Sequence, residues 1–285
     1  MTSDDAALAR AWEQQSVWSQ VADRLKRELQ RYRIRVLTLT VIGAVLSAAA
    51  VVAGLDAGAG KVLAALGGAA MGLAALDRAR LGKDAVQRWT RARSVAEELK
   101  SEVYLYLTGV GAQRLDEQID ALADDAADLA PLKAGVAPKP RDLPPVRDVE
   151  SYILDRLVVQ IETYYRPKAA ELQRKSDRIR AAQQWLAGVG VLAAAAAAIW
   201  ETDSVAVWVP VLTTIGAALA AYGAAERYDF QVVEFLRTAD QLERLRDRRG
   251  PAAAMSDEEL VRAAEQVISI QNDGWMAKLS SDPEN

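Results

Sequence analysis

The sequence predicts an all-α membrane protein with four transmembrane helices, built as two tandem repeats of helix, transmembrane hairpin and helix. Three observations support this fold class. Four uncharged apolar runs occur as two closely spaced pairs. Charged segments with apolar residues at helical spacing flank each pair, which predicts long cytoplasmic amphipathic helices. Alanine and leucine dominate, and no alternating run of Val, Ile and Thr is long enough for a sheet.

Composition excludes several classes of site. Hydrophobic residues make up 51% of the chain and charged residues 26%, and the two kinds are segregated into blocks. The chain has no cysteine and no histidine, so disulfides, thiolate metal sites and histidine-based chemistry are impossible. The net charge of −4 argues against a nucleic-acid partner. No Walker loop, GxGxxG or HExxH motif occurs, so we expect no enzyme, no cofactor and no metal.

Residues 1–35 predict a basic amphipathic helix. One face at helical spacing contains Trp18, Val21, Ala22, Leu25 and Leu29, and arginines and lysines cover much of the rest. One interpretation is a solvated helix that packs on a neighbour. The other is a juxtamembrane helix that touches anionic lipid, and the two can coexist.

The first predicted hairpin has spans at 36–55 and 62–78. Val36 to Leu55 is a run of 20 uncharged residues, which matches a bilayer core of about 30 Å. The second arm is marginal, because only the 15 residues from Val62 to Leu76 are uncharged. It can reach across the bilayer if flanking basic side chains snorkel.

The alternative to a membrane hairpin is a hairpin of buried soluble helices. The absence of a polar face on the first helix and the recurrence of the plan disfavour it.

A helix and a linker are expected after the first hairpin. Val95, Leu99, Val103 and Leu107 recur every fourth residue in a helix over 81–108 that stops at Gly109. Residues 110–147 combine an acidic block with five prolines, which predicts a solvated acidic helix followed by stiff, extended linker. A metal or partner site in the acidic block is the less favoured alternative.

The second repeat follows the same plan over residues 148–285. A basic amphipathic helix leads into spans at 181–200 and 205–225, and a charged helix continues to about residue 249. Trp185, Trp200 and Trp208 fall near the ends of these spans, where an interfacial belt would place them. Ser256 and Glu259 predict a capping box that opens the last helix.

Short identities link the two halves. Glu28-Leu29-Gln30-Arg31 matches Glu171-Leu172-Gln173-Arg174, and Arg33-Ile34-Arg35 matches Arg178-Ile179-Arg180. The hairpins exit into Asp77-Arg78 and Glu226-Arg227. The chain is therefore divided into a first repeat (1–109), a linker (110–147) and a second repeat (148–285). Two spans in each copy make this a parallel repeat.

Lysine and arginine near the spans predict the orientation. Both hairpins are flanked by basic residues, whereas the two hairpin turns carry only Lys61 between them. By the positive-inside rule, both termini and the linker are cytoplasmic.

Small residues at four-residue spacing mark candidate helix-packing sites. These pairs are Gly43 and Ser47, Gly68 and Gly72, and Gly216 and Ala220. Small side chains let membrane helices approach closely, since lipid provides no hydrophobic drive for their association. The pairs either close each hairpin or drive formation of homo-oligomers.

The chain resembles a known family. Trp12, Gln15 and Trp18-Ser19 precede the first hairpin, Trp89-x-Arg91 follows it, and Tyr165-Arg166-x-x-Ala169 precedes the second. This pattern resembles tandem SLATT-type proteins, the two-transmembrane domains associated with SMODS nucleotidyltransferases and SLOG proteins. The family brings no catalytic residues.

The resemblance implies a multi-pass effector in the inner membrane of bacteria, within an antiviral conflict system. It would oligomerise and perturb the membrane or form a pore, and its partners would be the lipid bilayer and a nucleotide-signalling enzyme or sensor. The alternative is a membrane scaffold whose cytoplasmic helices dock a partner protein. A soluble helical bundle with alanine-rich cores is a third hypothesis.

Overall fold

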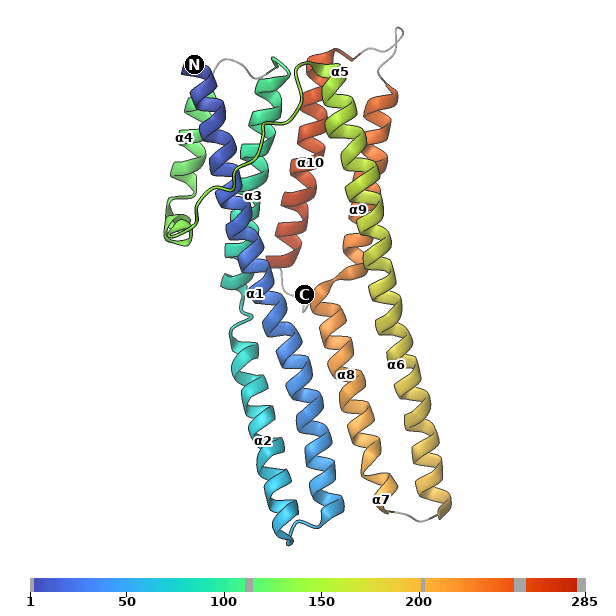
Figure 1. Cartoon of the computed structure of the whole chain (residues 1–285). Helices are drawn as coiled ribbons and strands as arrows, with labels where there is room; N and C mark the ends of the chain where they lie inside the picture. The colour runs from blue at the N-terminus through green and yellow to red at the C-terminus, as the bar shows by residue number, and fades with distance from the viewer. Residues whose placement is uncertain (1–2, 111–114, 201–202, 249–254, 281–285) are drawn as a thin grey trace. The chain divides into compact units, whose positions relative to one another are not determined.

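The computed structural model describes residues 3–110, 115–200, 203–248 and 255–280, and within these residues it contains helices and no strands (Figure 1). The α-helices are α1 (Ser3–Ala53), α2 (Gly58–Ala79), α3 (Lys83–Leu107), α4 (Leu115–Asp125), α5 (Val149–Tyr152), α6 (Arg166–Trp200), α7 (Asp203–Ala206), α8 (Trp208–Glu226), α9 (Tyr228–Asp247) and α10 (Asp257–Ser280). A 3₁₀ helix, η1 (Ala127–Lys133), follows α4, and two π-helical segments, η2 (Ile153–Val158) and η3 (Gln160–Tyr165), connect α5 to α6. The all-α prediction is confirmed.

The chain forms two compact units that cut across the predicted repeats. One, here called the core unit, contains residues 1–27, 83–170 and 231–285. The other, the span unit, contains residues 28–82 and 171–230. Each unit therefore takes residues from both halves of the sequence.

The predicted spans lie in helices whose ends have local causes. α1 ends at Ala53 because Gly54 adopts a left-handed conformation with φ of 85°. α2 extends beyond the predicted second span to 22 residues, which gives about 33 Å and removes the shortfall in length. The predicted span 205–225 is divided between α7 and α8, three residues before Pro210, whose ring disfavours a continuous helix.

The segment predicted as a linker is packed onto α1 within the core unit. Arg141 donates to the carbonyl oxygen of Trp12 at 2.7 Å and lies 3.5 Å from the centre of the Trp12 ring. The Lys139 amide donates to Ser16 Oγ at 2.9 Å. In the acidic block, Asp116 pairs with Arg10 at 2.6 Å. The proline-rich segment is therefore an extended strap that Arg141 and Lys139 attach to α1, rather than a spacer between two domains.

A four-residue stripe organises the helix from α5 to α6 in the core unit. Its buried side chains are Ile153, Leu157, Ile161, Tyr165 and Ala169. In a pure α-helix, a four-residue step overshoots a full turn by about 40°, so such a stripe would wrap around the helix. The wider π turns of η2 and η3 offset this drift, and the Arg166 amide bonds the Ile161 carbonyl five residues back. The stripe thus stays on the face that packs against α9 and α10.

A buried ion pair lies inside this packed core. Arg156 donates from Nε and Nη2 to the two carboxylate oxygens of Glu265, each at 3.1 Å, and both side chains are almost fully buried. Tyr152 donates to Glu265 Oε1 at 2.8 Å, and the Arg156 guanidinium lies 4.4 Å from the Tyr104 ring centre. Burial and the Glu265 carboxylate raise the pKa of Tyr152 well above its usual range. Burial alone would lower the pKa of Arg156, but the opposite charge and hydrogen bonds of Glu265 have the larger effect, so the pKa is raised.

Charged residues of α3 line the same region. Burial alone would raise the pKa of Glu97, but Arg93, Lys100 and Arg156 outweigh it, so the pKa is lowered. Burial, followed by the charge of Arg156, lowers the pKa of Lys100 to about 8.

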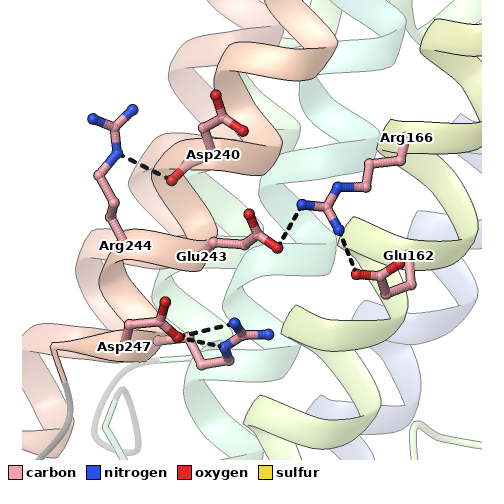
Figure 2. Close-up of polar contacts among 7 residues, drawn as sticks. Glu162, Arg166, Asp240, Glu243, Arg244 and Asp247 are labelled. Carbon is pink, nitrogen blue, oxygen red and sulfur yellow. Dashed lines mark hydrogen bonds and ion pairs between the residues drawn. The ribbon is translucent and has the colours of Figure 1, made fainter.

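Polar contacts at the edge of the core unit connect η3 and α6 to α9 (Figure 2). Arg166 donates to Glu162 at 2.8 Å along its own helix and to Glu243 of α9 at 2.7 Å.

At the start of α10, the Ser256 amide donates to Glu259 and the Glu259 amide donates to Ser256 Oγ, which confirms the predicted capping box.

We predict that the buried pair tolerates joint replacement better than the loss of one partner. Arg156→Met should lower the free energy of unfolding by about 3–5 kcal/mol, because it leaves Glu265 charged and buried. The triple variant Tyr152→Phe/Arg156→Met/Glu265→Met should lie within about 1–2 kcal/mol of wild type. Arg10→Met, which removes an exposed ion pair, serves as the control. It should change the free energy of unfolding by less than about 1 kcal/mol. Denaturant titration of the full chain in detergent measures all three, and equal losses in the single and triple variants would contradict the prediction.

We also predict a pH dependence from Lys100. Its pKa of about 8 in the folded chain is below the ordinary value of 10.5. Between these values the unfolded chain keeps a proton that the folded chain has lost, so stability rises with pH. Lys100→Met should therefore be more stable than wild type below pH 8, and the difference should shrink from about pH 8 to 10.5 in thermal unfolding curves. A difference that is constant with pH would refute this assignment.

Candidate functional site

The spans expose an apolar surface that suits lipid. Among the described residues, four helices are long and apolar enough to cross a membrane. Large apolar side chains are exposed along them, which a soluble surface rarely tolerates in contiguous patches. They include Ile42, Val51, Val52, Val62, Leu66, Leu73, Leu76, Val191, Leu192 and Ile199. The candidate functional site is therefore the span unit itself.

Small residues bring the two helices of the first hairpin into close contact. A Cβ built on Gly67 would lie 2.8 Å from Ser47 Oγ and 3.2 Å from the Gly43 carbonyl oxygen. A Cβ on Gly43 would lie 2.7 Å from the Met71 side chain. Gly43 and Ser47 thus lie in the packed contact, as the hairpin-closing interpretation requires. Their partner on α2 is Gly67, a position the sequence analysis did not select.

Gly68 and Gly72 lie on the opposite side of α2. A Cβ at either position meets no atom within 4 Å, so these residues do not close the hairpin. The buried face of α2 is instead formed by Gly60, Gly67, Ala70, Ala74 and Asp77. This corrects the hairpin-closing interpretation for Gly68 and Gly72, and packing against another copy stays a prediction for them.

The second hairpin is packed much more loosely. In the most apolar stretch of both α1 and α2, 22% of the residues are buried. The corresponding share is 0% in α6 and 6% in the segment from α7 to α9. A Cβ on Gly216 meets no atom within 4 Å, and Ala220 is exposed. This pair therefore makes no tight contact inside the described chain. Trp185 and Trp200 are strongly exposed and Trp208 is just exposed, so nothing in the structure tests their predicted interfacial role.

Buried acids occupy the exits of both hairpins. Asp77, at the end of α2, pairs with Arg35 Nε at 3.1 Å and lies 3.9 Å from Arg80. Glu226, at the end of α8, accepts from Arg33 Nη1 at 3.0 Å. One Arg-Ile-Arg motif of α1 thus binds the acid of each hairpin and links the two hairpins within the span unit.

Tyr32 adds a stacked contact beside Asp77. Its ring centre lies 5.7 Å from the Arg35 guanidinium and 5.5 Å from that of Arg80, and its hydroxyl accepts from Arg80 at 3.2 Å. At the exit of the first hairpin, these contacts therefore join side chains of the same hairpin.

The exit of the second hairpin uses a different acid. Arg180 corresponds to Arg35 in the repeat, yet it pairs with Asp229 of α9, which also accepts from Ser176 Oγ at 2.7 Å. The Ser176 hydrogen bond is the largest influence on Asp229 and lowers its pKa. The sequence analysis identified the acid–arginine exits but not these partners, because the pairing depends on how the helices pack.

Comparison with known families supports the assignment of the spans. Residues 152–275 match the family model described as SMODS and SLOG-associating 2TM effector domain 1. Residues 16–114 match another model, described as protein of unknown function (DUF4231). Searches of curated proteins and of solved structures gave no match.

The first match extends from Tyr152 to Trp275 and so includes both arms of the second hairpin. The resemblance to SLATT-type proteins is confirmed, while the first repeat matches a family of unknown function. The chain is a multi-pass membrane protein whose second repeat matches, over residues 152–275, the model of the SMODS and SLOG-associating two-transmembrane effector domain.

Proposed function

We propose that this chain is a non-enzymatic membrane effector of a bacterial antiviral, nucleotide-signalling conflict system. It acts in the inner membrane by oligomerising and perturbing the bilayer or forming a pore. The observation that carries this proposal is the effector-domain match over residues 152–275, which coincides with the loosely packed second hairpin.

The second hairpin has the properties of a segment that changes its contacts. Lipid tails are as apolar as the spans, so helices without close backbone contact lose little when they separate or exchange partners. α6 and α8 lack the tight glycine contacts that join α1 to α2. We therefore assign membrane perturbation to rearrangement of the second hairpin or to its contacts with other copies.

The core unit is the proposed receiver of the signal. The basic flanks of the spans favour a cytoplasmic location for the charged helices and both termini. Helix α10 belongs to this unit, where Leu260, Val261 and Ala264 lie in its apolar core and Glu265 binds Arg156. Arg262 also donates to the Val110 carbonyl at 3.0 Å. A nucleotide-signalling enzyme or sensor that bound this unit would contact helices that belong to both halves of the sequence.

We predict that triggered expression depolarises cells. The gene should be expressed in bacteria together with its neighbouring genes and the trigger, and membrane potential followed with a potential-sensitive dye. Potential and growth should fall only when the trigger is present. Unchanged potential and growth would contradict the proposal, and unchanged potential with stable capture of a partner would favour the scaffold alternative.

We predict different outcomes for leucine on the two sides of α2. Gly67→Leu should lower hairpin stability by about 1–3 kcal/mol, since the added side chain overlaps Ser47 and Gly43. Gly68→Leu/Gly72→Leu should leave thermal stability in detergent unchanged but reduce both oligomer mass and depolarisation, because these glycines are open within the chain. Ala69→Leu is the matched control for added bulk on an exposed position. Wild-type oligomers in the double variant would mean that this face contacts only lipid.

A further inference from the structure

A row of side chains on α1 holds the proline-rich strap, residues 131–146, within the core unit (Figure 1). The row consists of Trp12, Ser16, Gln20 and Arg24, which are spaced four residues apart. Positions at this spacing lie near one another on a helix, and twelve residues rise by about 18 Å. The four side chains therefore form a ladder along the face of α1 that contacts the strap.

Each side chain of the ladder bonds a main-chain atom of the strap. The four contacts are Trp12 Nε1 to the Asp142 carbonyl at 2.9 Å, the Lys139 amide to Ser16 Oγ at 2.9 Å, Gln20 Nε2 to the Ala137 carbonyl at 2.9 Å, and Arg24 Nη2 to the Leu132 carbonyl at 2.7 Å. The strap residues descend as the α1 residues ascend, so the strap runs antiparallel to α1. Because main-chain groups are common to all residues, the ladder recognises an extended backbone rather than a particular sequence.

One side chain of the strap is recognised as well. The Arg141 guanidinium lies 3.5 Å from the centre of the Trp12 ring and donates to the Trp12 carbonyl at 2.7 Å. It also donates to Gln15 Oε1. A planar guanidinium suits both stacking and several hydrogen bonds at once. This face of α1 therefore selects an arginine within an extended segment.

Buried polar groups on α1 are committed to these contacts. Gln15 is 3% exposed and Ser16 is 4% exposed, and a buried polar side chain is costly unless it is hydrogen-bonded. Gln15 receives Arg141, and Ser16 receives the Lys139 amide. An apolar contact between α1 and the strap would need neither polar group, so the face is built to bind a polar backbone.

The strap itself resembles a bound peptide more than a part of the apolar core. No residue from 134 to 145 is buried. Pro138 and Pro140 fix φ in the polyproline range, so the segment loses little conformational freedom when it binds. The apolar core includes Val146, at the end of the strap. Release of residues 134–145 from α1 would therefore leave the described apolar core in place.

We propose that the face of α1 formed by Trp12, Gln15, Ser16 and Gln20 is a docking surface for a proline-rich, arginine-containing segment of a partner protein. The strap occupies this surface within the chain and competes with that segment. Extended proline-rich peptides bind aromatic-lined surfaces in this manner, because their backbone is already in the bound conformation. The inference does not rest on membrane perturbation, since docking involves only the core unit.

The same segment of a second copy is a poorer occupant than a partner protein. Both ends of the strap are fixed within their own chain, because Arg24 binds the Leu132 carbonyl and Val146 lies in the apolar core. A second copy could supply its strap only by giving up the same contacts on its own α1. Such an exchange would replace contacts without adding any.

The test is binding of a fluorescently labelled peptide with the sequence of residues 134–146 to the full chain in neutral detergent. Arg141→Ala in the protein weakens the hold of its own strap, so it should bind the peptide at least ten-fold tighter than wild type, measured by fluorescence anisotropy. Arg147→Ala removes the same charge from an exposed position outside the strap and should bind as wild type does. Equal binding by Arg141→Ala and wild type, or binding by neither, would overturn the proposal.

Changes on the two binding partners test the recognition itself. A peptide that carries Arg141→Ala should bind the Arg141→Ala protein at least ten-fold more weakly than the unchanged peptide. This comparison leaves the protein unaltered, so it does not depend on the folding of a further variant. Trp12→Ala, added to the Arg141→Ala protein, should also weaken binding, whereas Glu13→Ala at the exposed neighbouring position should not. Equal binding of the two peptides would overturn the proposal.

Disulfide trapping distinguishes a partner protein from a second copy. The chain has no cysteine, so Ser16→Cys in one tagged copy and Lys139→Cys in another introduce the only two thiols. These positions are in contact within one chain. After co-expression, purification and mild oxidation, we expect no disulfide between the two tagged copies. A disulfide between them would assign the surface to the strap of a second copy and overturn the assignment to a partner protein.

Discussion

The pairing of buried acids with the Arg33-Ile34-Arg35 motif is the interaction on which the span unit depends. An ionised carboxylate with little solvent access is costly unless a cation and hydrogen bonds compensate it. Asp77 and Glu226 sit at the ends of different hairpins, and neighbouring arginines of α1 bind one each. Loss of either arginine would leave a buried carboxylate without its main partner. The motif thus fixes both hairpins relative to α1 within this unit.

The two repeats share an order of parts but differ in how they are stabilised. Glycine and serine contacts join α1 to α2 along the predicted span, whereas α6 and α8 have no comparable contact. Since lipid supplies no hydrophobic drive, close packing is the main source of cohesion between spans. The first hairpin is accordingly the cohesive one. The arm with the shortest uncharged run, the second arm of this hairpin, is thus the one that these close contacts hold.

Much of the fold follows from sequence patterns, and the exceptions have physical causes. Run length and charge located the spans, and periodicity located the buried faces of α1 and α3. The sequence left open whether Gly68 and Gly72 close the hairpin or pack on another copy, because four-residue spacing identifies a pair of small residues but not the side on which a neighbour lies. Proline density indicated an extended segment over 131–145, but not that Arg141 and Lys139 attach it to α1. Arg156 lies beside the apolar stripe of Ile153 and Leu157, which could have marked it as a buried cation, but its partner Glu265 is more than one hundred residues away in the sequence.

The divergence of the hairpin exits connects stability to function. In the first repeat the buried acid Asp77 is bound within its own hairpin, by Arg35 and Arg80, and Tyr32 lies beside both arginines. In the second repeat Glu226 is bound by Arg33 of α1, and Arg180 pairs with Asp229 and with Asp177. Close backbone contacts join the helices of the first hairpin, and α6 and α8 of the second hairpin have none as close. The hairpin that matches the effector domain is therefore the less cohesive of the two, because lipid itself supplies no drive for its helices to associate.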